Sequence, residues 1–364
     1  MKKLITGILL AAFFISTQSF AETRVALLIS GYGSEGDTNI SYDLEELAQT
    51  YLVLNDNGIE LDIISPKGGA VHVHNKKDVL PYIQQFKQKT PALKQLMNTL
   101  SAKQAQNNEY DALMIIGGNG AMFDLPVHTE TQTFIQQFVT QQAPIVAVCH
   151  GPAALINVKL ENGDFFLKGK RVNSFTVKEE HAFKAELIDK YPFMLEPTLK
   201  ERGAKFVSNL PMLPYLAEDG LLITAQNPMS VAKAADALLV KLGKTPKART
   251  LFKDEATMQL ISQARIEGAY LIDLALATSK DNYNLQYLAL YGFYAYKLAE
   301  TQAHKLIELR IMERIGEHFS HPNYSEALAK AYLEQGFDEK AKTEVKALKN
   351  NFPTFEISED LIKL

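Results

Sequence analysis

Cysteine and tryptophan are nearly absent from this chain, and neither sign of charge dominates it. The 364 residues include one cysteine, no tryptophan, 38 Lys and Arg, and 42 Asp and Glu. A single cysteine excludes an internal disulfide scaffold. The lack of a basic excess argues against nucleic-acid binding, because neutralising phosphates requires a basic stripe. With 46% hydrophobic and 22% charged residues the composition is that of a globular protein, so small molecules or proteins remain as partners.

A long apolar run is found at the N-terminus. Lys2 and Lys3 precede the apolar run Leu4–Ile15, and Ser19–Ala21 supplies a small-residue cleavage site. This pattern is typical of a cleaved secretory signal. The run is shorter than the roughly 20 residues of a spanning helix, so no stable membrane anchor is expected. Removing the two lysines takes the formal net charge from -4 to -6, and the mature chain is predicted to begin at Glu22 in the periplasm or outside the cell.

Short apolar runs alternate with helical periodicity between residues 22 and 243. Several of the runs are apolar throughout, as expected for strands buried on both faces of a sheet. The expected strands are Arg24–Ser30, Ile59–Ser65, Asp111–Gly117, Ile145–Val148, Lys205–Ser208 and Leu221–Ala225. The expected helices are Ser41–Asn57, a two-part stretch within Asp78–Ala105, Thr129–Gln142, Pro152–Val158, Glu180–Tyr191, Phe193–Arg202 and Pro228–Leu242. The pattern predicts an α/β fold with a doubly wound, mostly parallel, flavodoxin-like sheet.

The composition changes after Gly243. Residues 22–243 contain 26 Gly and Pro, whereas residues 244–364 contain only 7, so long helices are expected there. Eight of the 15 tyrosines lie in this part, several at helical spacing, as in Tyr283, Tyr287, Tyr291 and Tyr294. Aromatic residues at this spacing favour helix-to-helix packing over ligand binding. The sequence therefore predicts a second, all-α domain.

Residues 327–353 resemble the latter part of a tetratricopeptide unit, in which small residues let paired helices approach closely. An offset of 38 residues aligns Tyr294 with Tyr332 and Ala303 with Ala341. The period differs from 34 and fewer than three units are visible, so an array of helical hairpins is the safer prediction.

The strongest chemical signal is the run Ala-Val-Cys-His-Gly-Pro at 147–152. A buried strand is expected to end at Val148 and a helix to begin at Pro152, so Cys149 falls on the bend between them. This placement predicts an exposed sulfur above a helix N-terminus, where the dipole lowers a cysteine pKa and favours the thiolate. The alternative, a buried cysteine followed by a surface histidine, is disfavoured by the strand before it and the Gly-Pro after it.

Three further motifs accompany this run. They are Gly-Gly-Asn-Gly-Ala-Met-Phe-Asp-Leu-Pro at 117–126, Asn-Ser-Phe-Thr-Val-Lys-Glu-Glu at 173–180, and Ile-Thr-Ala-Gln-Asn-Pro at 223–228. Together the four motifs resemble the PfpI-type superfamily on the class I glutamine-amidotransferase-like fold, in particular its branch of heat-shock chaperones and glutathione-independent glyoxalases. The resemblance covers about residues 24–242. It implies a catalytic domain at 22–243 between a signal peptide at 1–21 and the helical domain at 244–364, with the segment between Pro66 and Tyr110 forming part of a cover over the site.

The resemblance also assigns roles. Cys149 matches the family nucleophile and His150 the histidine that follows it. Glu180 matches the carboxylate that orients His150, with Glu179 as the alternative, and such a carboxylate fixes the imidazole tautomer. Glu46 matches the acid beside the cysteine, where its pKa should be raised so that it can donate to sulfur or shuttle a proton.

Three more assignments follow from the same resemblance. Glu45 is expected to be solvated. Gly118 and the backbone amide of Asn119 match an oxyanion pocket completed by the amide of His150. Relatives usually have histidine at position 119 and proline at position 50, where this chain has Asn119 and Thr50, and this difference bears on substrate preference. The loop at residues 31–39 also differs from the family pattern and is expected to reshape the entrance.

Two other motifs are weak. His72 and His74 would share one side of a strand, but they lack a third and fourth ligand, so a solvated loop is favoured over a metal site. The run Gly117–Gly120 lacks the Lys-Ser/Thr of a phosphate loop, so nucleotide binding is not expected.

The leading hypothesis is a glyoxalase III-like enzyme that converts 2-oxoaldehydes such as methylglyoxal to 2-hydroxy acids without a metal or organic cofactor. Two alternatives remain open at this stage. One is a stress chaperone whose helical domain binds a protein partner, and the other is repair of glycated proteins or peptide hydrolysis by the same thiol. Related proteins frequently form homodimers, although the sequence shows no self-complementary patch.

Overall fold

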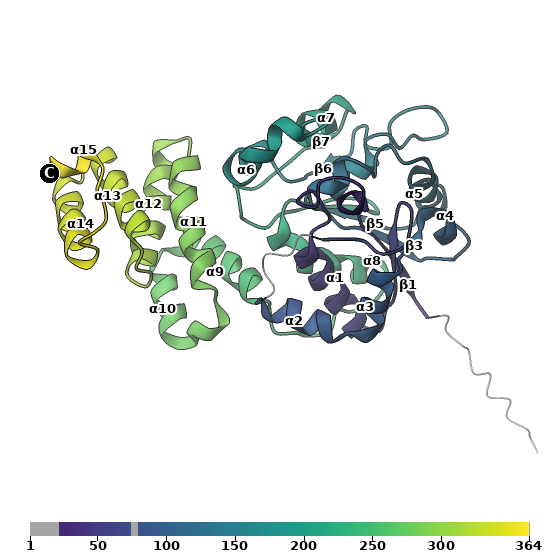
Figure 1. Ribbon diagram of the computed structural model, residues 1–364, viewed down its shortest axis with the longest axis horizontal. Helices are drawn as coiled ribbons and strands as arrows, with labels where there is room; N and C mark the ends of the chain where they lie inside the picture. The colour runs from purple at the N-terminus through teal and green to yellow at the C-terminus, as the bar shows by residue number, and fades with distance from the viewer. Residues whose placement is uncertain (1–21, 74–78, 364) are drawn as a thin grey trace, which may run out of the picture.

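The computed structural model describes residues 22–73 and 79–363 (Figure 1). The expected signal segment 1–21 and His74 lie outside the described residues. Figure 1 shows two parts side by side, an α/β part and a stack of helices at its flank. None of the helices in the described ranges has the length and apolarity needed to cross a membrane.

A seven-stranded sheet organises the α/β part. Its strand order is β3-β2-β1-β4-β5-β9-β8, and every neighbouring pair is parallel except β8 with β9. The doubly wound, mostly parallel sheet predicted from the sequence is confirmed. Its strands are β1 (Arg24–Leu28), β2 (Glu60–Ser65), β3 (Leu100–Ser101), β4 (Ala112–Ile115), β5 (Ile145–Val148), β8 (Leu216–Asp219) and β9 (Leu222–Ala225).

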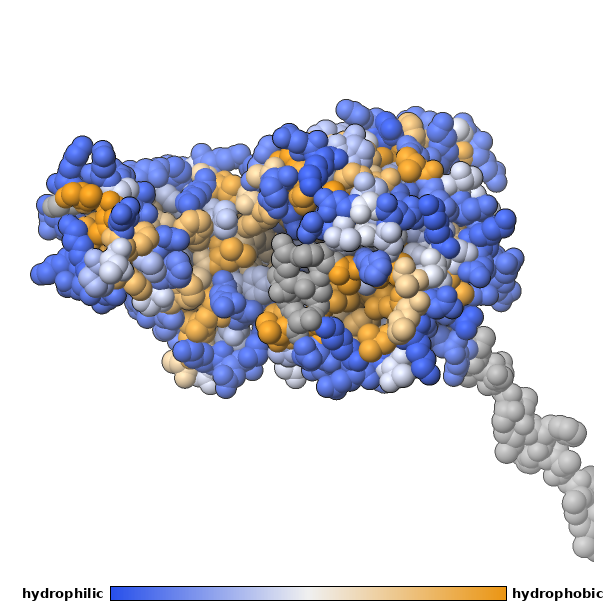
Figure 2. Space-filling view, viewed as in Figure 1, coloured by the Kyte–Doolittle hydropathy of each residue, from blue (hydrophilic) through white to orange (hydrophobic). Residues whose placement is uncertain are grey.

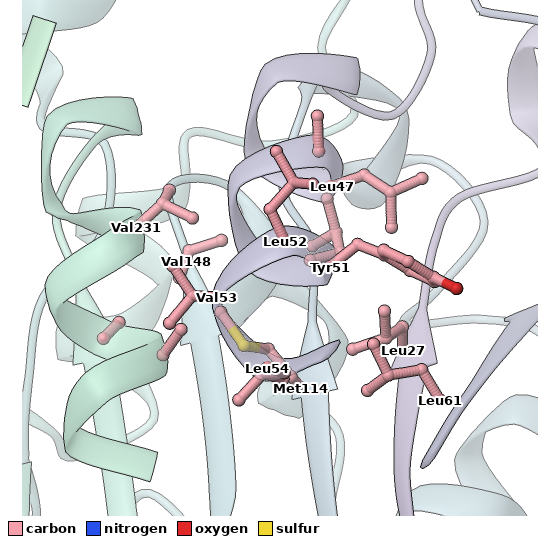
Figure 3. Packing of buried hydrophobic residues seen from close by; sticks show 14 of the residues in the cluster. Leu27, Leu47, Tyr51, Leu52, Val53, Leu54, Leu61, Met114, Val148 and Val231 are labelled. Atoms are coloured by element: carbon pink, nitrogen blue, oxygen red, sulfur yellow. The ribbon is translucent and has the colours of Figure 1, made fainter. Parts of the chain in front are cut away.

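Both faces of the sheet are covered, which explains why its strands are apolar throughout. Successive side chains of a strand point to opposite faces: Val25 and Leu27 pack in one core cluster, and Ala26 and Leu28 in the other. The first cluster includes residues of α1 (Leu44–Asp56), α2 (Pro81–Gln88) and α8 (Val231–Lys241), as Figure 3 shows for the α1 and α8 side chains. The second includes α4 (Ala102–Ala105), α5 (Thr129–Gln141) and α7 (Leu195–Glu201).

Some elements differ from the expected ones because tertiary contacts decide short segments. The segment expected to begin a helix at Pro152 forms a 3-10 helix, η3 (Gly151–Leu155). The helix expected at Glu180–Tyr191 is divided into α6 (Val177–Phe183) and η4 (Ala185–Lys190). Between residues 78 and 105 the described helices also include α3 (Thr90–Met97).

The strand expected at Lys205–Ser208 does not join the main sheet. It forms β7 (Lys205–Phe206), which pairs with β6 (Arg171–Val172) in a separate two-stranded sheet. The edge strands β3 and β8 were not predicted from the sequence. They are two and four residues long and contain few apolar residues, so the pattern carries little signal.

Beyond Gly243 the described chain is helical, as the scarcity of glycine and proline predicted. Helices pair in sequence as α9 with α10, α11 with α12, and α13 with α14. Three hairpins are therefore present where the sequence showed fewer than three units, and their assignment as tetratricopeptide units stays a prediction. The helices are α9 (Lys253–Glu267), α10 (Tyr270–Ser279), α11 (Leu285–Leu298), α12 (Gln302–Gly316), α13 (Pro322–Glu334), α14 (Asp338–Asn351) and α15 (Glu359–Ile362).

The tyrosines at helical spacing divide into two groups. Tyr287 and Tyr291 lie in the core cluster of the helical part, as predicted. Tyr294 instead makes an edge-on ring contact with Phe183 of α6, with 4.9 Å between ring centroids. Since Met212 of the α/β part belongs to the same core cluster as Tyr287, the two parts share a continuous apolar contact.

Candidate active site

Cys149 lies directly after the interior strand β5, at the carboxyl edge of the sheet. Its φ of 55° is in the left-handed region, which is strained for a residue with a side chain. Two backbone hydrogen bonds hold this conformation: Cys149 N donates to Ala225 O over 2.8 Å, and Cys149 O accepts from Phe175 N over 3.0 Å. The sharp bend predicted between strand and helix is therefore present, and neighbouring segments keep it in place.

His150 links the thiol to a carboxylate. Its Nδ1 lies 3.2 Å from Cys149 Sγ, and its Nε2 lies 2.7 Å from Glu180 Oε1. All three side chains are buried. The other Glu180 oxygen accepts a hydrogen bond of 3.1 Å from the hydroxyl of Tyr191, a contact that the sequence analysis did not anticipate. An ionised Glu180 favours a proton on Nε2, which leaves Nδ1 free to accept the proton of the thiol.

Glu179, the alternative partner of His150, has a different place. Its carboxylate accepts hydrogen bonds from Thr176 of its own helix start, from the backbone of Met212, and from the side chains of Gln226 and Asn227. These contacts join α6 to two loops, while the neighbouring Glu180 points to His150. The geometry thus brings Glu180, and not Glu179, to the histidine.

Glu46 reaches the site from α1. Its Oε2 accepts a hydrogen bond of 2.8 Å from the backbone amide of Gly117. A Cβ atom at Gly117 would lie 2.5 Å from Val148 O, 2.8 Å from Cys149 Cβ and 2.8 Å from Glu46 Oε2. No side chain fits in this space, so glycine is what lets α1, β4 and β5 converge.

The electrostatics of the cluster confirm one expectation and overturn another. Burial, followed by the charge of Asp43, raises the pKa of Glu46 well above its ordinary 4.5, as expected. Burial, followed by the charges of Glu46 and Asp43, also raises the pKa of the Cys149 thiol well above 9.0. Glu46 Oε1 makes no hydrogen bond within the described part of the chain. The charge of Glu46 disfavours the ionisation of the thiol, whereas contact with the thiol opposes part of the rise in the pKa of Glu46.

The expected exposed, low-pKa sulfur is therefore wrong for the resting site. Cys149 is only 4% exposed. The bend places its thiol in the packing between β5 and α1, where the charges of Glu46 and Asp43 act on it. The element that follows is a five-residue 3-10 helix, which is too short to supply the expected dipole.

The predicted oxyanion residues lie on the same edge of the sheet. Gly118 has a φ of 90°, and a Cβ there would meet Asp43 N at 2.4 Å, so this position also requires glycine. Neither the amide of Asn119 nor that of His150 donates a hydrogen bond to another residue in the described ranges. Both residues line one pocket with Cys149, so two amide donors are available beside the sulfur.

Glu45 was expected to be solvated and is instead buried. Its Oε2 lies 3.1 Å from the hydroxyl of Tyr82 and 3.3 Å from the hydroxyl of Tyr287 on α11. The Tyr82 hydroxyl also lies 2.9 Å from Asp254 Oδ2, which accepts a hydrogen bond from Gln49. Helix α11 and the start of α9 cover this side of α1, and the sequence of α1 alone cannot reveal that cover.

The pocket above Cys149 has a volume of about 650 Å³. Its walls come from the loop before α1, the segment α6–η4, the loop around Met212, and helix α11. No described residue between Pro66 and Tyr110 lines it, so the expected cover from this segment is not found among residues 66–73 and 79–110. Lining residues absent from the sequence-based site include Phe183, Leu187, Met212, Met229, Tyr287 and Leu290.

Three other features singled out from the sequence, which are His72, Thr50 and the loop 31–39, are not part of the group around the thiol. His72 is exposed, and its backbone amide donates to Ser34 Oγ. Within the described residues no group of three or more His, Cys, Asp or Glu could hold a metal ion. Thr50 is buried in α1. From the divergent loop 31–39, Asn39 lines the pocket, and the effect of this loop on the entrance stays a prediction.

Residues 39–241 match the model of the DJ-1/PfpI family. Glutathione-independent glyoxalase hsp3101 of Schizosaccharomyces pombe is 29% identical over 233 residues, covering 60% of this chain and 96% of that protein. Glutathione-independent glyoxalase HSP31 of Saccharomyces cerevisiae is 26% identical over 228 residues, covering 59% and 96%. The X-ray structure of the Rapid Encystment Protein 24 KDa of Francisella tularensis is 32% identical, with a TM-score of 0.56 and coverage of 60% and 99%.

Proposed function

The chain belongs to the DJ-1/PfpI family, and from this membership we propose that it is a cofactor-independent cysteine enzyme that converts 2-oxoaldehydes such as methylglyoxal to 2-hydroxy acids. The observation that carries the proposal is the buried chain Cys149–His150–Glu180 beside Glu46, open to a pocket lined by Asn119 and His150, whose amides donate to no other residue in the described part of the chain. Relatives matched over nearly their whole length carry the name glutathione-independent glyoxalase.

The first step forms a carbon–sulfur bond. The Cys149 sulfur attacks the aldehyde carbon, and its proton moves to Nδ1 of His150, 3.2 Å away. The aldehyde oxygen takes up the negative charge, and the amides of Asn119 and His150 stabilise it by hydrogen bonding. His150 then gives the proton to this oxygen, and the product is a neutral hemithioacetal. Since the resting thiol is protonated, transfer to His150 accompanies the attack.

The second step moves one proton between two carbons and one between their two oxygens. Glu46, in its ionised form, removes the hydrogen of the former aldehyde carbon as a proton and returns it to the neighbouring carbonyl carbon. His150 takes the hydroxyl proton of the hemithioacetal and gives it to the oxygen of that neighbouring carbon, which becomes the hydroxyl of the product. Burial raises the pKa of Glu46, so its carboxylate is a stronger base than an exposed one. The resulting 2-hydroxy thioester is cleaved by one water molecule, which releases the 2-hydroxy acid and restores the thiol. The net reaction consumes one water and needs no external oxidant or reductant.

Lactate formation from methylglyoxal tests the proposal. The purified protein should form lactate, and Cys149→Ala should abolish this activity because the nucleophile is lost. Leu274→Ala, on the exposed side of α10, serves as the matched control. Absence of lactate, or undiminished turnover by the Cys149 variant, removes the proposal. Repair of glycated proteins, peptide hydrolysis and chaperone action are then the alternatives to assay with the same two variants.

Export completes the proposal. A cleaved segment 1–21 would place the enzyme in the periplasm or outside the cell, where it would meet reactive aldehydes from the surroundings. The expected result is a mature protein that begins at Glu22, as measured by intact mass on the exported fraction. Retention of Lys2 and Lys3 in the mature protein contradicts this part of the proposal.

A further inference from the structure

The pocket is much larger than the small aldehyde used to define the chemistry. Methylglyoxal has five non-hydrogen atoms and occupies roughly 100 Å³, on the scale of about 30 Å³ for a water molecule in the liquid. The pocket of about 650 Å³ lies in the range of sites that enclose a whole organic ligand of moderate size. Most of this space is therefore available to a part of the substrate other than the two reacting carbons.

One wall of the pocket comes from outside the family domain. Tyr287 and Leu290 of α11 line it, whereas the family match ends at residue 241. Tyr287 is 9% exposed and Leu290 is 37% exposed, so Leu290 presents apolar surface to the open space. On the face that Figure 2 shows, apolar side chains lie on the helical part near its junction with the α/β part, with hydrophilic surface around them.

Helix α11 is held in this position by contacts to both helices that carry the site carboxyls. The hydroxyl of Tyr287 lies 3.3 Å from Glu45 Oε2 on α1, next in sequence to Glu46. On the other side, Tyr294 contacts the ring of Phe183 on α6, the helix of Glu180. The wall is therefore fixed relative to the reacting groups, as a surface that selects substrates must be.

The surfaces opposite α11 include apolar side chains among polar ones. Phe183, Leu187 and Met229 line the pocket together with Leu290. The charged residues of the lining include Lys190, which pairs with Asp37 over 3.0 Å, and Glu179, which is held by several donors. An apolar group of a substrate would thus find partners on both sides, whereas Lys190 is paired with Asp37 and Glu179 is engaged by its hydrogen-bond donors. Lys184 and Glu186 also line the pocket.

We propose that Leu290 and Tyr287 of α11 form a specificity wall that selects 2-oxoaldehydes with an aryl or branched alkyl substituent. This inference rests on the proposed function for its substrate class and goes beyond it in naming the substituent. Contact with Leu290 favours the bulky substituent, and the hydrogen bond from Tyr287 to Glu45 fixes the ring that bounds the space.

The test compares phenylglyoxal with methylglyoxal as paired substrates. Leu290→Ala should lower the ratio of kcat/KM for phenylglyoxal to kcat/KM for methylglyoxal about tenfold, because a lost apolar contact of this size changes discrimination by ~10–200-fold. Leu290→Trp, which fills the space, should lower the ratio further. Leu274→Ala, an exposed leucine on α10, should leave the ratio unchanged. An unchanged ratio in both Leu290 variants overturns the inference.

A second measurement separates this inference from the proposed reaction. Cys149 is the only cysteine, so its alkylation reports access to the pocket without any turnover. The alkylation ratio is the rate of Cys149 alkylation by the bulky N-phenylmaleimide divided by the rate with the small iodoacetamide. Leu290→Trp should lower this ratio at least fivefold, and Leu274→Ala should leave it unchanged. If neither aldehyde is turned over but this selectivity changes, the reaction is wrong and the wall stands. If lactate forms but neither the substrate ratio nor the alkylation ratio moves, the wall is wrong and the reaction stands.

Discussion

The two sides of the pocket are built in different ways. On the sheet side, Cys149, His150 and Glu46 are almost completely buried and are held by a strained backbone, short hydrogen bonds and an obligatory glycine. On the helical side, Leu290 is partly exposed and meets the pocket through apolar contact alone. A change on the sheet side therefore disturbs several groups at once, whereas a change on the helical side alters one surface. Chemistry and selectivity can thus vary separately in this molecule.

The largest effect is expected from Gly117→Ala on the sheet side. The added Cβ would lie 2.5 Å from Val148 O and 2.8 Å from Cys149 Cβ, so the backbone must shift. We expect the free energy of unfolding to fall by about 3 kcal/mol and turnover to be nearly lost, as measured by denaturant unfolding and lactate assay. Gly31→Ala is the matched control, since neither Gly31 nor Gly117 has a positive φ and a Cβ at Gly31 would meet its nearest atom at 3.6 Å, an ordinary contact. Equal losses in both variants would mean that the added methyl group itself, and not crowding at the thiol, is responsible.

Next in size is the contrast between Glu180→Gln and Glu179→Gln. Glutamine at 180 keeps the shape but no longer stabilises a positively charged His150, so kcat should fall on the order of 10²-fold with little change in Tm. Glutamine at 179 loses acceptors for Met212 and Asn227, so its main effect should be a lower Tm. Steady-state kinetics and thermal unfolding of both variants check this division. The opposite pattern would assign the orienting role to Glu179.

A pH series sharpens the comparison further. The folded pKa of Glu46 is raised above 4.5 by burial, so folding favours the protonated form. Stability linked to this group is fully present below pH of about 4.5 and is lost as pH rises toward the folded pKa. Glu46→Gln removes the ionisation, so the variant should gain stability relative to the wild-type protein as pH rises above 4.5. Urea unfolding of both proteins from pH 4 to 8 measures the difference between their free energies of unfolding. A difference that stays constant with pH would show that Glu46 does not titrate in this way.

The smallest effect is expected at the rim between the two parts. Lys178 of α6 pairs with Glu300 over 2.7 Å, but the two side chains are 46% and 71% exposed. Solvent screens such a pair, so Lys178→Ala should leave the Tm almost unchanged. Thermal unfolding at low and high salt provides the measurement. A loss of Tm as large as that of Glu179→Gln would indicate that this ion pair, and not the apolar contacts of α11, holds the parts together.

Much of the site could be predicted because its signals are local. The strand before Cys149 and the turn-forming residues after it lie within a few positions of each other, and the same holds for the glycines at 117 and 118. The family resemblance then identified His150, Glu180 and Glu46 as site residues, and the structure brings them together around Cys149. The choice of Glu180 over Glu179 required the structure, because adjacent residues of a helix point in directions about 100° apart and the sequence does not fix where the helix turns.

The errors have a common physical cause. The pKa of Cys149 was expected to be low from the bend alone, yet it is raised by burial against α1 and by carboxyls from distant positions. Glu45 was expected to be solvated, yet it is covered by Tyr287, 242 residues further along the chain. Each error concerns solvent access, which depends on every element packed around a group.

By itself the sequence determined the alternation of buried strands and helices, the bend that carries Cys149, and the helical character of the chain after Gly243. These are consequences of backbone preferences and of apolar periodicity, both of which act over a few residues. The tertiary structure alone decided that the thiol is enclosed and that α11 forms a wall of its pocket. Enclosure and pocket shape depend on contacts between segments that are remote in the sequence, and they exist only once those segments have packed.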